Sequence, residues 1–347
     1  MMRAYINATS AISPQSTFDV DNYIEELIPS EIDYLKAIEP NYRDFLDPKM
    51  ARRMARIIKM GVATSNKCLE SLAGNTPGAI ILGTGLGCLQ DTAKFLKDIV
   101  ETEEGLLSPT AFIQSTHNTI AGQIALLIGC TSHNFTYANR GFSFENALGD
   151  ALLHLEEGND YVLVGGIDEV IPETNSILKK IGCTQGNNDK SKELPVLGEG
   201  AAMFLLSSNE NEESLAVVEG VKTLFKPNNQ DEVIESIFNL LIETEVDMNQ
   251  VDGVLMGYNN SKKDDAIYDK LVTSIFEDKS IYQFKHISGE YFTANAFGCH
   301  IAAKMIANQK EYPEMLVKGN TTNIINYMLV YNHFNADYHS VTLLSKC

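Results

Sequence analysis

The sequence predicts an α/β fold in which helices cover a mostly parallel sheet. Two observations predict it: short apolar segments of strand character alternate with longer segments of helical spacing, and a second half repeats this order. The chain has 347 residues, of which 44% are hydrophobic and 21% are charged. It is therefore long enough to bury one large shared core.

The first half of the predicted structure spans residues 1–210. Its strands are expected at 4–7, 79–83, 134–138, 161–165 and 202–206. Its helices are expected at 50–72, at 120–128 and from Ser143 onward, where apolar side chains recur at helical spacing. A polar run at 207–213 is typical of a connector.

The second half spans residues 211–347. Its strands are expected at 215–222, 251–256, 283–287, 326–331 and 340–345, and its helices at 232–243, 265–276 and 294–308. Because this order is similar to that of the first half, the sequence indicates an internal duplication within one structural unit.

A concentrated basic run occupies residues 49–59. Its apolar members Met50, Met54, Ile57 and Ile58 are spaced as an inward-facing stripe, which favours a core helix with a solvated basic face. A local contact with an anion or a subunit is the alternative.

The net charge of −19 disfavours nucleic acid and anionic membranes as partners, because both require clustered cationic side chains. The longest apolar runs, such as 161–167, are far shorter than the roughly 20 residues of a membrane-spanning helix. The N-terminus lacks the basic-then-apolar pattern of a secretion signal. We therefore expect a cytoplasmic protein.

The sequence gives no indication of a metal or a cofactor. Cys130 with His133, and Cys299 with His300, are paired potential ligands, but neither pair has a C-x-x-C partner, so buried thiols are favoured. The glycine-rich segment 83–87 lacks the third glycine of a dinucleotide fingerprint.

Four short motifs occur in a characteristic order. They are G-T-G-L-G at 83–87, N-T-I-A-G at 118–122, G-G-I-D-E at 165–169 and G-E-G-A at 198–201. In order and spacing they resemble the beta-ketoacyl synthases of the thiolase superfamily, and the resemblance covers nearly the whole chain. It implies a thiolase-like fold of five layers, αβαβα, and a family activity of 3-oxoacyl-[acyl-carrier-protein] synthase.

The resemblance also locates the position of the family's cysteine nucleophile. Counting from Gly129 and back from Gly149 places it at Gly141, between the strand at 134–138 and the helix that begins at Ser143. A helix N-terminus there would lower a thiol's pKa and stabilise an oxyanion. Glycine has no side chain that could act as a nucleophile.

Three further catalytic elements of the family are altered. Gly257 lies in the turn that would carry the first histidine, and Glu290 replaces the second, although Lys285 is retained. The segment 332–339 lacks the glycines of the family's mobile loop. Lys285 and Glu290 are either a structural ion pair or a polar wall of a remaining pocket. We expect no catalytic residues.

This combination is similar to the chain-length-factor subunits of type II polyketide systems, and more narrowly to ketosynthase-like proteins of aryl-polyene and dialkylresorcinol clusters. The resemblance implies a non-catalytic subunit that forms a heterodimer with a catalytic ketosynthase and contacts the acyl carrier protein indirectly. A homodimer is possible in isolation. It also implies acyl-tunnel or interface positions at Leu86, Ala111 and Phe112, the last two in a loop after Ser108 and Pro109.

Two alternatives stay open. A diverged 3-oxoacyl-carrier-protein synthase or acyltransferase acting on its own would need an atypical nucleophile, for which Ser143 and Cys88 are the nearby candidates. Ser143 is better interpreted as a helix N-cap and Cys88 as a packing residue. A homodimeric protein that binds acyl groups for storage or sensing is the other alternative.

Overall fold

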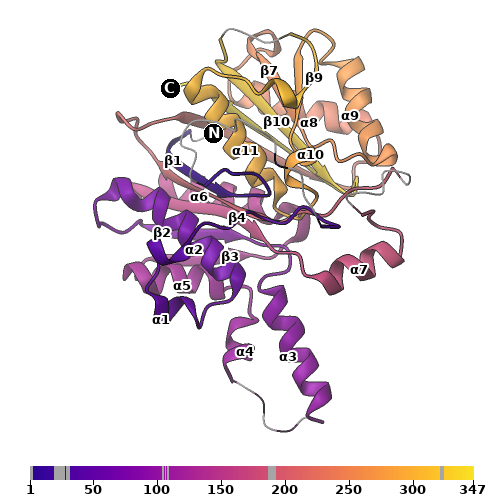
Figure 1. The fold of residues 1–347 in the computed structure, drawn as a ribbon. Coiled ribbons are helices and arrows are strands. Elements are labelled where there is room, and N and C mark those ends of the chain that lie inside the picture. The colour runs from indigo at the N-terminus through magenta and orange to yellow at the C-terminus, as the bar shows by residue number, and fades with distance from the viewer. Residues whose placement is uncertain are drawn as a thin grey trace.

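The computed structural model describes residues 3–18, 28, 32–103, 105, 107, 109–186, 193–320 and 324–347. Within them, eleven strands form one sheet in the order β3-β2-β4-β5-β1-β6-β11-β10-β7-β8-β9. Figure 1 shows the part with β2, β3 and β4 below the part with β7, β9 and β10. The predicted α/β class is confirmed.

The strands of the first half lie close to their predicted positions. They are β1 (Ala4–Ile12), β2 (Ala79–Gly83), β3 (His133–Tyr137), β4 (Tyr161–Asp168) and β5 (Gly200–Ser207). β2 pairs in parallel with β3 and β4, whereas β5 is antiparallel to β4 and β1.

The second half contributes the remaining strands. They are β6 (Ala216–Phe225), β7 (Gly253–Met256), β8 (Ser280–Gln283), β9 (Leu316–Lys318), β10 (Tyr327–Phe334) and β11 (Tyr338–Ser345). β1 pairs with β6, so the sheet is continuous between the halves. The predicted boundary at 210 and 211 lies in the turn between β5 and β6.

Six helices form three layers that alternate with the two halves of the sheet. They are α2 (Arg56–Leu69), α5 (Thr119–Ile128), α6 (Ser143–Glu156), α8 (Gln230–Glu243), α9 (Lys262–Ser274) and α11 (Ala294–Asn308). α11 contacts β4 and β5 of the first half and β10 and β11 of the second, so it lies between the halves. α6 packs on β2, β4 and β6, whereas α2 and α8 cover the outer faces.

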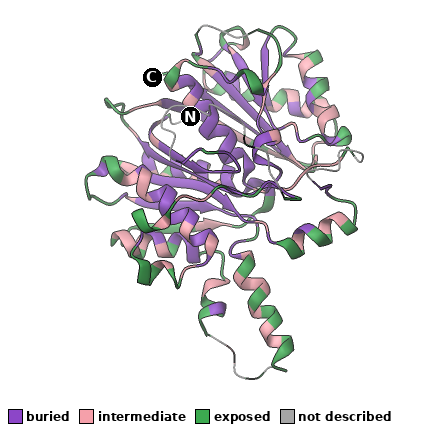
Figure 2. Cartoon of the chain, viewed as in Figure 1, coloured by how far each residue is buried: buried purple, intermediate pink, exposed green. Residues whose placement is uncertain are grey.

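Three hydrophobic clusters fill the spaces where these layers pack against one another. One lies between the halves and includes Phe144 and Phe297, a second lies under α2 and α5, and a third lies under α8 and α9. Figure 2 shows buried residues concentrated in the strands and central helices, with exposed residues on the outer helices. The order helix, sheet, helix, sheet, helix matches the predicted five layers.

One predicted strand is wrong. The segment 283–287 was expected to be extended, but β8 ends at Gln283 and the short helix α10 (Lys285–Ser288) follows. Gly289, with φ of 76°, ends α10 because its amide donates to the carbonyl of Lys285 in a conformation that suits glycine.

The predicted core helix over the basic run is correct only from Arg56 onward, where Ile57 and Ile58 are buried as expected. Its residues are divided between α1 (Pro48–Ala51) and the beginning of α2. Met50 is 40% exposed, whereas Ile57 is fully buried. Arg56 is not on a solvated face, because its guanidinium lies 2.5 Å from the buried carboxylate of Glu199. That ion pair links α2 to the G-E-G-A motif at 198–201, where β5 begins.

Sequence analysis missed three helices, namely α3 (Leu89–Glu101), α4 (Pro109–Gln114) and α7 (Pro172–Lys180). α3 and α4 form a hairpin that projects from the body of the molecule (Figure 1). The expected loop after Pro109 is therefore a helix, and Ser108 lies outside the described residues. In the described part of the chain, no helix is long and apolar enough to cross a membrane.

Candidate functional site

The turn between β3 and α6 carries the glycine at the predicted nucleophile position. Gly141 is buried in a 3-10 turn, and Arg140 before it adopts a left-handed φ of 48°. A Cβ atom on Gly141 would lie 2.8 Å from Cβ of Phe334 and 2.9 Å from Cβ of Tyr338. A cysteine therefore does not fit here unless the β10–β11 hairpin moves.

That hairpin replaces the mobile loop expected at 332–339. Its strands pair in register up to Phe334 and Tyr338, and the turn residues Asn335 and Ala336 both have φ of 56°. The Phe334 ring packs 4.6 Å from the ring of Phe292, measured between centroids. The segment is a packed hairpin rather than a glycine-rich loop.

The first histidine position has no space for a side chain. Gly257 follows β7, and a Cβ atom on it would lie 2.7 Å from the Tyr268 hydroxyl and 3.0 Å from Cε of Lys285. It would also collide with the Asn332 side chain.

The second histidine position holds a buried ion pair. The Lys285 ammonium donates to Glu290 at 2.9 Å and to the carbonyl of His333 at 3.0 Å. Asn259 donates to the same carboxylate oxygen of Glu290 at 2.7 Å. Burial raises the pKa of Glu290, while Lys285 and the hydrogen bonds oppose that rise.

A cavity of about 280 Å³ adjoins these elements. Its wall is mainly apolar and includes Leu86, Leu89, Leu178 and Phe334, with Glu290 among its polar members. Lys285 and Glu290 thus form an ion pair, and Glu290 also lines this cavity, which joins the two interpretations left open from sequence. Phe334 both lines this cavity and packs on Gly141, so it lies between them.

Two buried carboxyl groups that sequence analysis missed hold this region together. Asp168, at the end of β4, accepts hydrogen bonds from the amide of Gly85 at 2.7 Å and from the amide and hydroxyl of Thr293 at 2.9 and 2.8 Å. It joins the glycine-rich turn to the start of α11. Its place in the G-G-I-D-E motif is the signal that could have identified it.

Glu145, in the first turn of α6, is the other carboxyl group. It accepts hydrogen bonds from Asn295 of α11 and from Ser340 of β11, both at 2.9 Å. Burial raises its pKa to about 7. It joins α6 to the second half.

The two alternative nucleophiles are both buried. Ser143 accepts a hydrogen bond from the amide of Asn139 at 2.9 Å and donates to the carbonyl of Arg140 at 2.8 Å, so it holds the turn. Burial raises the pKa of the Cys88 thiol far above its usual range, and the charges of Glu169 and Asp91 add to this. A thiol with a raised pKa is a poor nucleophile.

The predicted tunnel positions lie in two places. Leu86 is 41% exposed and lines the cavity. Ala111 and Phe112 lie on α4, outside the lining of this cavity, and Phe112 packs on Phe95 with ring centroids 5.4 Å apart. The structure therefore does not bring the three positions together within one chain.

Comparisons with known proteins agree with this arrangement. Residues 31–185 match the model of the beta-ketoacyl synthase N-terminal domain. A beta-ketoacyl synthase from Burkholderia phymatum STM815 superposes with a TM-score of 0.80 at 14% identity, covering 100% of both chains. The fold is that of the beta-ketoacyl synthases. The resemblance inferred from the motifs is confirmed.

Two structures with chain length factors also share this ketosynthase fold. The ishigamide ketosynthase/chain length factor matches with a TM-score of 0.78 at 16% identity, covering 100% of this chain and 99% of that one. A ketosynthase in complex with its chain length factor from Xenorhabdus doucetiae matches with a TM-score of 0.78 at 12% identity, covering 100% and 98%. The sequence matches no curated protein.

Proposed function

We propose that this chain is a non-catalytic ketosynthase-like subunit that pairs with an active beta-ketoacyl synthase and shapes its acyl tunnel. The observation that carries the proposal is Gly141, which stands at the nucleophile position with its space closed by Phe334 and Tyr338. Without a nucleophile no acyl-enzyme can form, so the condensation chemistry has to come from another chain.

The two histidine positions support the same conclusion. Decarboxylative condensation builds negative charge on a thioester oxygen, which hydrogen-bond donors must stabilise. Gly257 cannot donate from a side chain, and Glu290 is bound to Lys285 and Asn259. A chain altered at all these positions while keeping the ketosynthase fold is suited to assembly rather than to turnover.

A heterodimer interface along β3 fits the surface of the chain. β3 ends the order of described strands, and Phe135 on it is 47% exposed. Leu126 on α5 and Leu153 on α6, the helices that pack against β3, are 70% and 57% exposed. An edge strand flanked by apolar side chains favours pairing with a second chain. Similar structures include ketosynthases with chain length factors.

The charge of the chain favours docking of the acyl carrier protein on the catalytic partner rather than on this chain. Carrier proteins are acidic, so a subunit with a net charge of −19 would repel one. We propose that the catalytic subunit docks the carrier, and that this chain influences the growing polyketide, aryl-polyene or fatty-acid-like chain through the tunnel wall. Leu86 is the strongest candidate for that wall because it already lines a cavity.

The cavity supports a second candidate function, namely acyl-group binding by a homodimer. Its volume of about 280 Å³ and its mainly apolar wall suit a short acyl chain. This candidate predicts a stable homodimer that binds acyl groups without a partner.

Co-expression with a ketosynthase that has an intact Cys-His-His set tests these alternatives. Native mass spectrometry should detect a 1:1 heterodimer, and malonyl-carrier condensation should occur with the pair but not with this chain alone. Condensation by this chain alone would refute the proposal. A homodimer that ignores the ketosynthase and binds acyl groups would favour the second candidate.

A further inference from the structure

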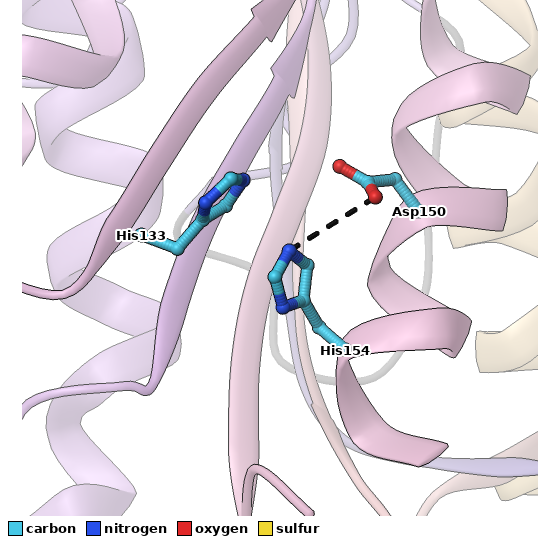
Figure 3. A group of neighbouring side chains, drawn as sticks. All are labelled: His133, Asp150 and His154. Carbon is cyan, nitrogen blue, oxygen red and sulfur yellow. Dashed lines mark ion pairs between the residues drawn. The ribbon is translucent and has the colours of Figure 1, made fainter. Parts of the chain in front are cut away.

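Two histidines and an aspartate converge on the surface formed by β3 and α6. His133 lies at the start of β3, and Asp150 and His154 lie one helical turn apart on α6 (Figure 3). One potential ligand atom from each side chain lies within 4.8 Å of the other two. Among the described residues, no other group of three or more such side chains comes as close together.

Local structure explains how the sequence brings them together. Side chains four residues apart project from the same face of a helix, so Asp150 and His154 lie side by side, with Nε2 of His154 4.0 Å from Oδ1 of Asp150. β3 packs against α6, which brings the His133 ring to 4.2 Å from the His154 ring, measured between centroids.

Two neighbouring side chains orient this group. Nδ1 of His154 lies 3.4 Å from a carboxylate oxygen of Glu157, which leaves Nε2 toward Asp150 and His133. Burial and the nearby Asp150 carboxylate raise the pKa of Tyr137, which also lies on β3, so its hydroxyl stays protonated beside that carboxylate. A carboxylate on the far nitrogen of a histidine and a donor on a ligating carboxylate are typical outer partners of metal ligands.

We propose that His133, Asp150 and His154 form a transition-metal site that suits Zn²⁺. Two imidazoles and one carboxylate are ligands that Zn²⁺ accepts, whereas Mg²⁺ and Ca²⁺ prefer oxygen ligands throughout. Three protein ligands leave a fourth tetrahedral position for water. Donor atoms at tetrahedral Zn²⁺ lie about 3.4 Å apart, so small side-chain rotations are enough to close the site.

An ordinary surface ion pair does not account for the whole arrangement. The Asp150–His154 spacing alone would be a common pairing along a helix. His133 is the independent observation, because it comes from a separate element and places a second imidazole against the first. Cys130, which sequence analysis paired with His133, is turned away, and its thiol donates to the carbonyl of Pro77 at 3.5 Å.

The site goes beyond the proposed function, and it lies on the β3–α6 surface that the proposed heterodimer would also use. Metal binding is therefore a property of the free chain. A bound metal would link the terminal strand β3 to α6. Because metal binds the folded chain, it should raise the melting temperature as the metal concentration rises.

Isothermal titration of the untagged, metal-stripped full chain with Zn²⁺ tests the proposal. One saturable equivalent should bind, and Zn²⁺ should raise the melting temperature. His133→Ala and His154→Ala should each lose this equivalent, and Glu157→Gln, which keeps all three ligands, should bind about tenfold more weakly. His117→Ala, which removes an exposed histidine elsewhere, should bind as the original chain does.

Co²⁺ provides a second measurement, since its visible spectrum reports the ligand set. We expect bands of nitrogen and oxygen ligation that disappear in His133→Ala. Circular dichroism of each metal-free variant establishes that it is folded before titration. Failure of the original chain to bind Zn²⁺, or unchanged binding in folded His133→Ala and His154→Ala, would overturn the proposal.

Discussion

At the scale of single residues, Gly141 shows how a missing side chain can be a structural requirement. The sequence located the position by spacing, but it could not show what fills the vacant volume. The structure places Cβ atoms of Phe334 and Tyr338 against the glycine, from a hairpin almost 200 residues later in the chain. That long-range contact is a property of packing, which no local pattern contains.

Gly141→Cys should therefore destabilise the chain without creating an enzyme. Overpacking a filled site typically costs about 1–3 kcal/mol, and both histidine positions are still altered. Urea denaturation should report the loss, and malonyl-thioester decarboxylation should stay at background. Gly149→Ala is the matched control on α6: nothing lies within 4 Å of its added Cβ, so it should stabilise the chain by about 0.4–1 kcal/mol. Decarboxylation by Gly141→Cys would contradict this account.

Glu145 should make stability depend on pH. Its folded pKa of about 7 lies above the usual value of 4.5, so the folded state holds a proton that the unfolded state releases between these values. Stability should therefore fall as pH rises from about 4.5 to 7. The neutral side chain of Glu145→Gln does not titrate, so this variant should not lose stability over this range. Its free energy of unfolding, relative to that of the original chain, should rise by on the order of 3 kcal/mol between pH 4.5 and pH 8.

Urea midpoints at pH 4.5 and pH 8 measure that difference. Glu235→Gln changes an exposed carboxylate on α8 and should show little pH-dependent change relative to the original chain. Equal responses of the two variants would mean that Glu145 titrates normally in the folded state.

At the scale of elements, regular periodicity predicted the buried elements well. β2, the start of α6 and both ends of α11 are where the sequence placed them, because each has a continuous apolar face. Sequence analysis overlooked α3 although its apolar side chains Leu89, Leu96 and Val100 recur at helical spacing, and none of its residues is buried in this chain. The wrong strand at 283–287 arose because a segment this short fits a strand or a single buried helical turn equally well.

The hairpin turn at Asn335 and Ala336 carries backbone strain that can be measured. Ala336 has φ of 56°, a conformation that costs a residue with a Cβ about 1 kcal/mol more than glycine. Ala336→Gly should raise the urea midpoint. The same change within a helix, Ala93→Gly in α3, should lower it by about 1 kcal/mol. A lower midpoint for Ala336→Gly would mean that residue 336 does not adopt this left-handed conformation in the folded protein.

At the scale of the whole molecule, the resemblance predicted more than the local patterns could. Ordered motifs identified the ketosynthase fold and the altered positions Gly141, Gly257 and Glu290. They left open whether Lys285 and Glu290 form an ion pair or line a pocket, and they did not predict that Ala111 would lie on a projecting helix. Those facts depend on how elements distant in sequence pack, which spacing within a motif cannot describe.

Changes at the proposed tunnel wall should alter the product of the heterodimer. Leu86→Trp adds volume to a residue that lines the cavity, so we expect shorter products with little change in partner affinity. Phe112→Ala on α4 should also shift product length. Mass spectrometry of the products measures both, with Leu96→Trp, on the exposed part of α3, as the control. Unchanged products in both variants would remove the tunnel assignment.

The central claim is that this chain carries no acyl group covalently. Intact-protein mass spectrometry of the heterodimer, after incubation with an acyl-carrier thioester, tests this claim most directly. The proposed function predicts an acyl adduct on the catalytic partner and an unchanged mass for this chain. An acyl adduct on this chain, at Ser143, Cys88 or elsewhere, would contradict it.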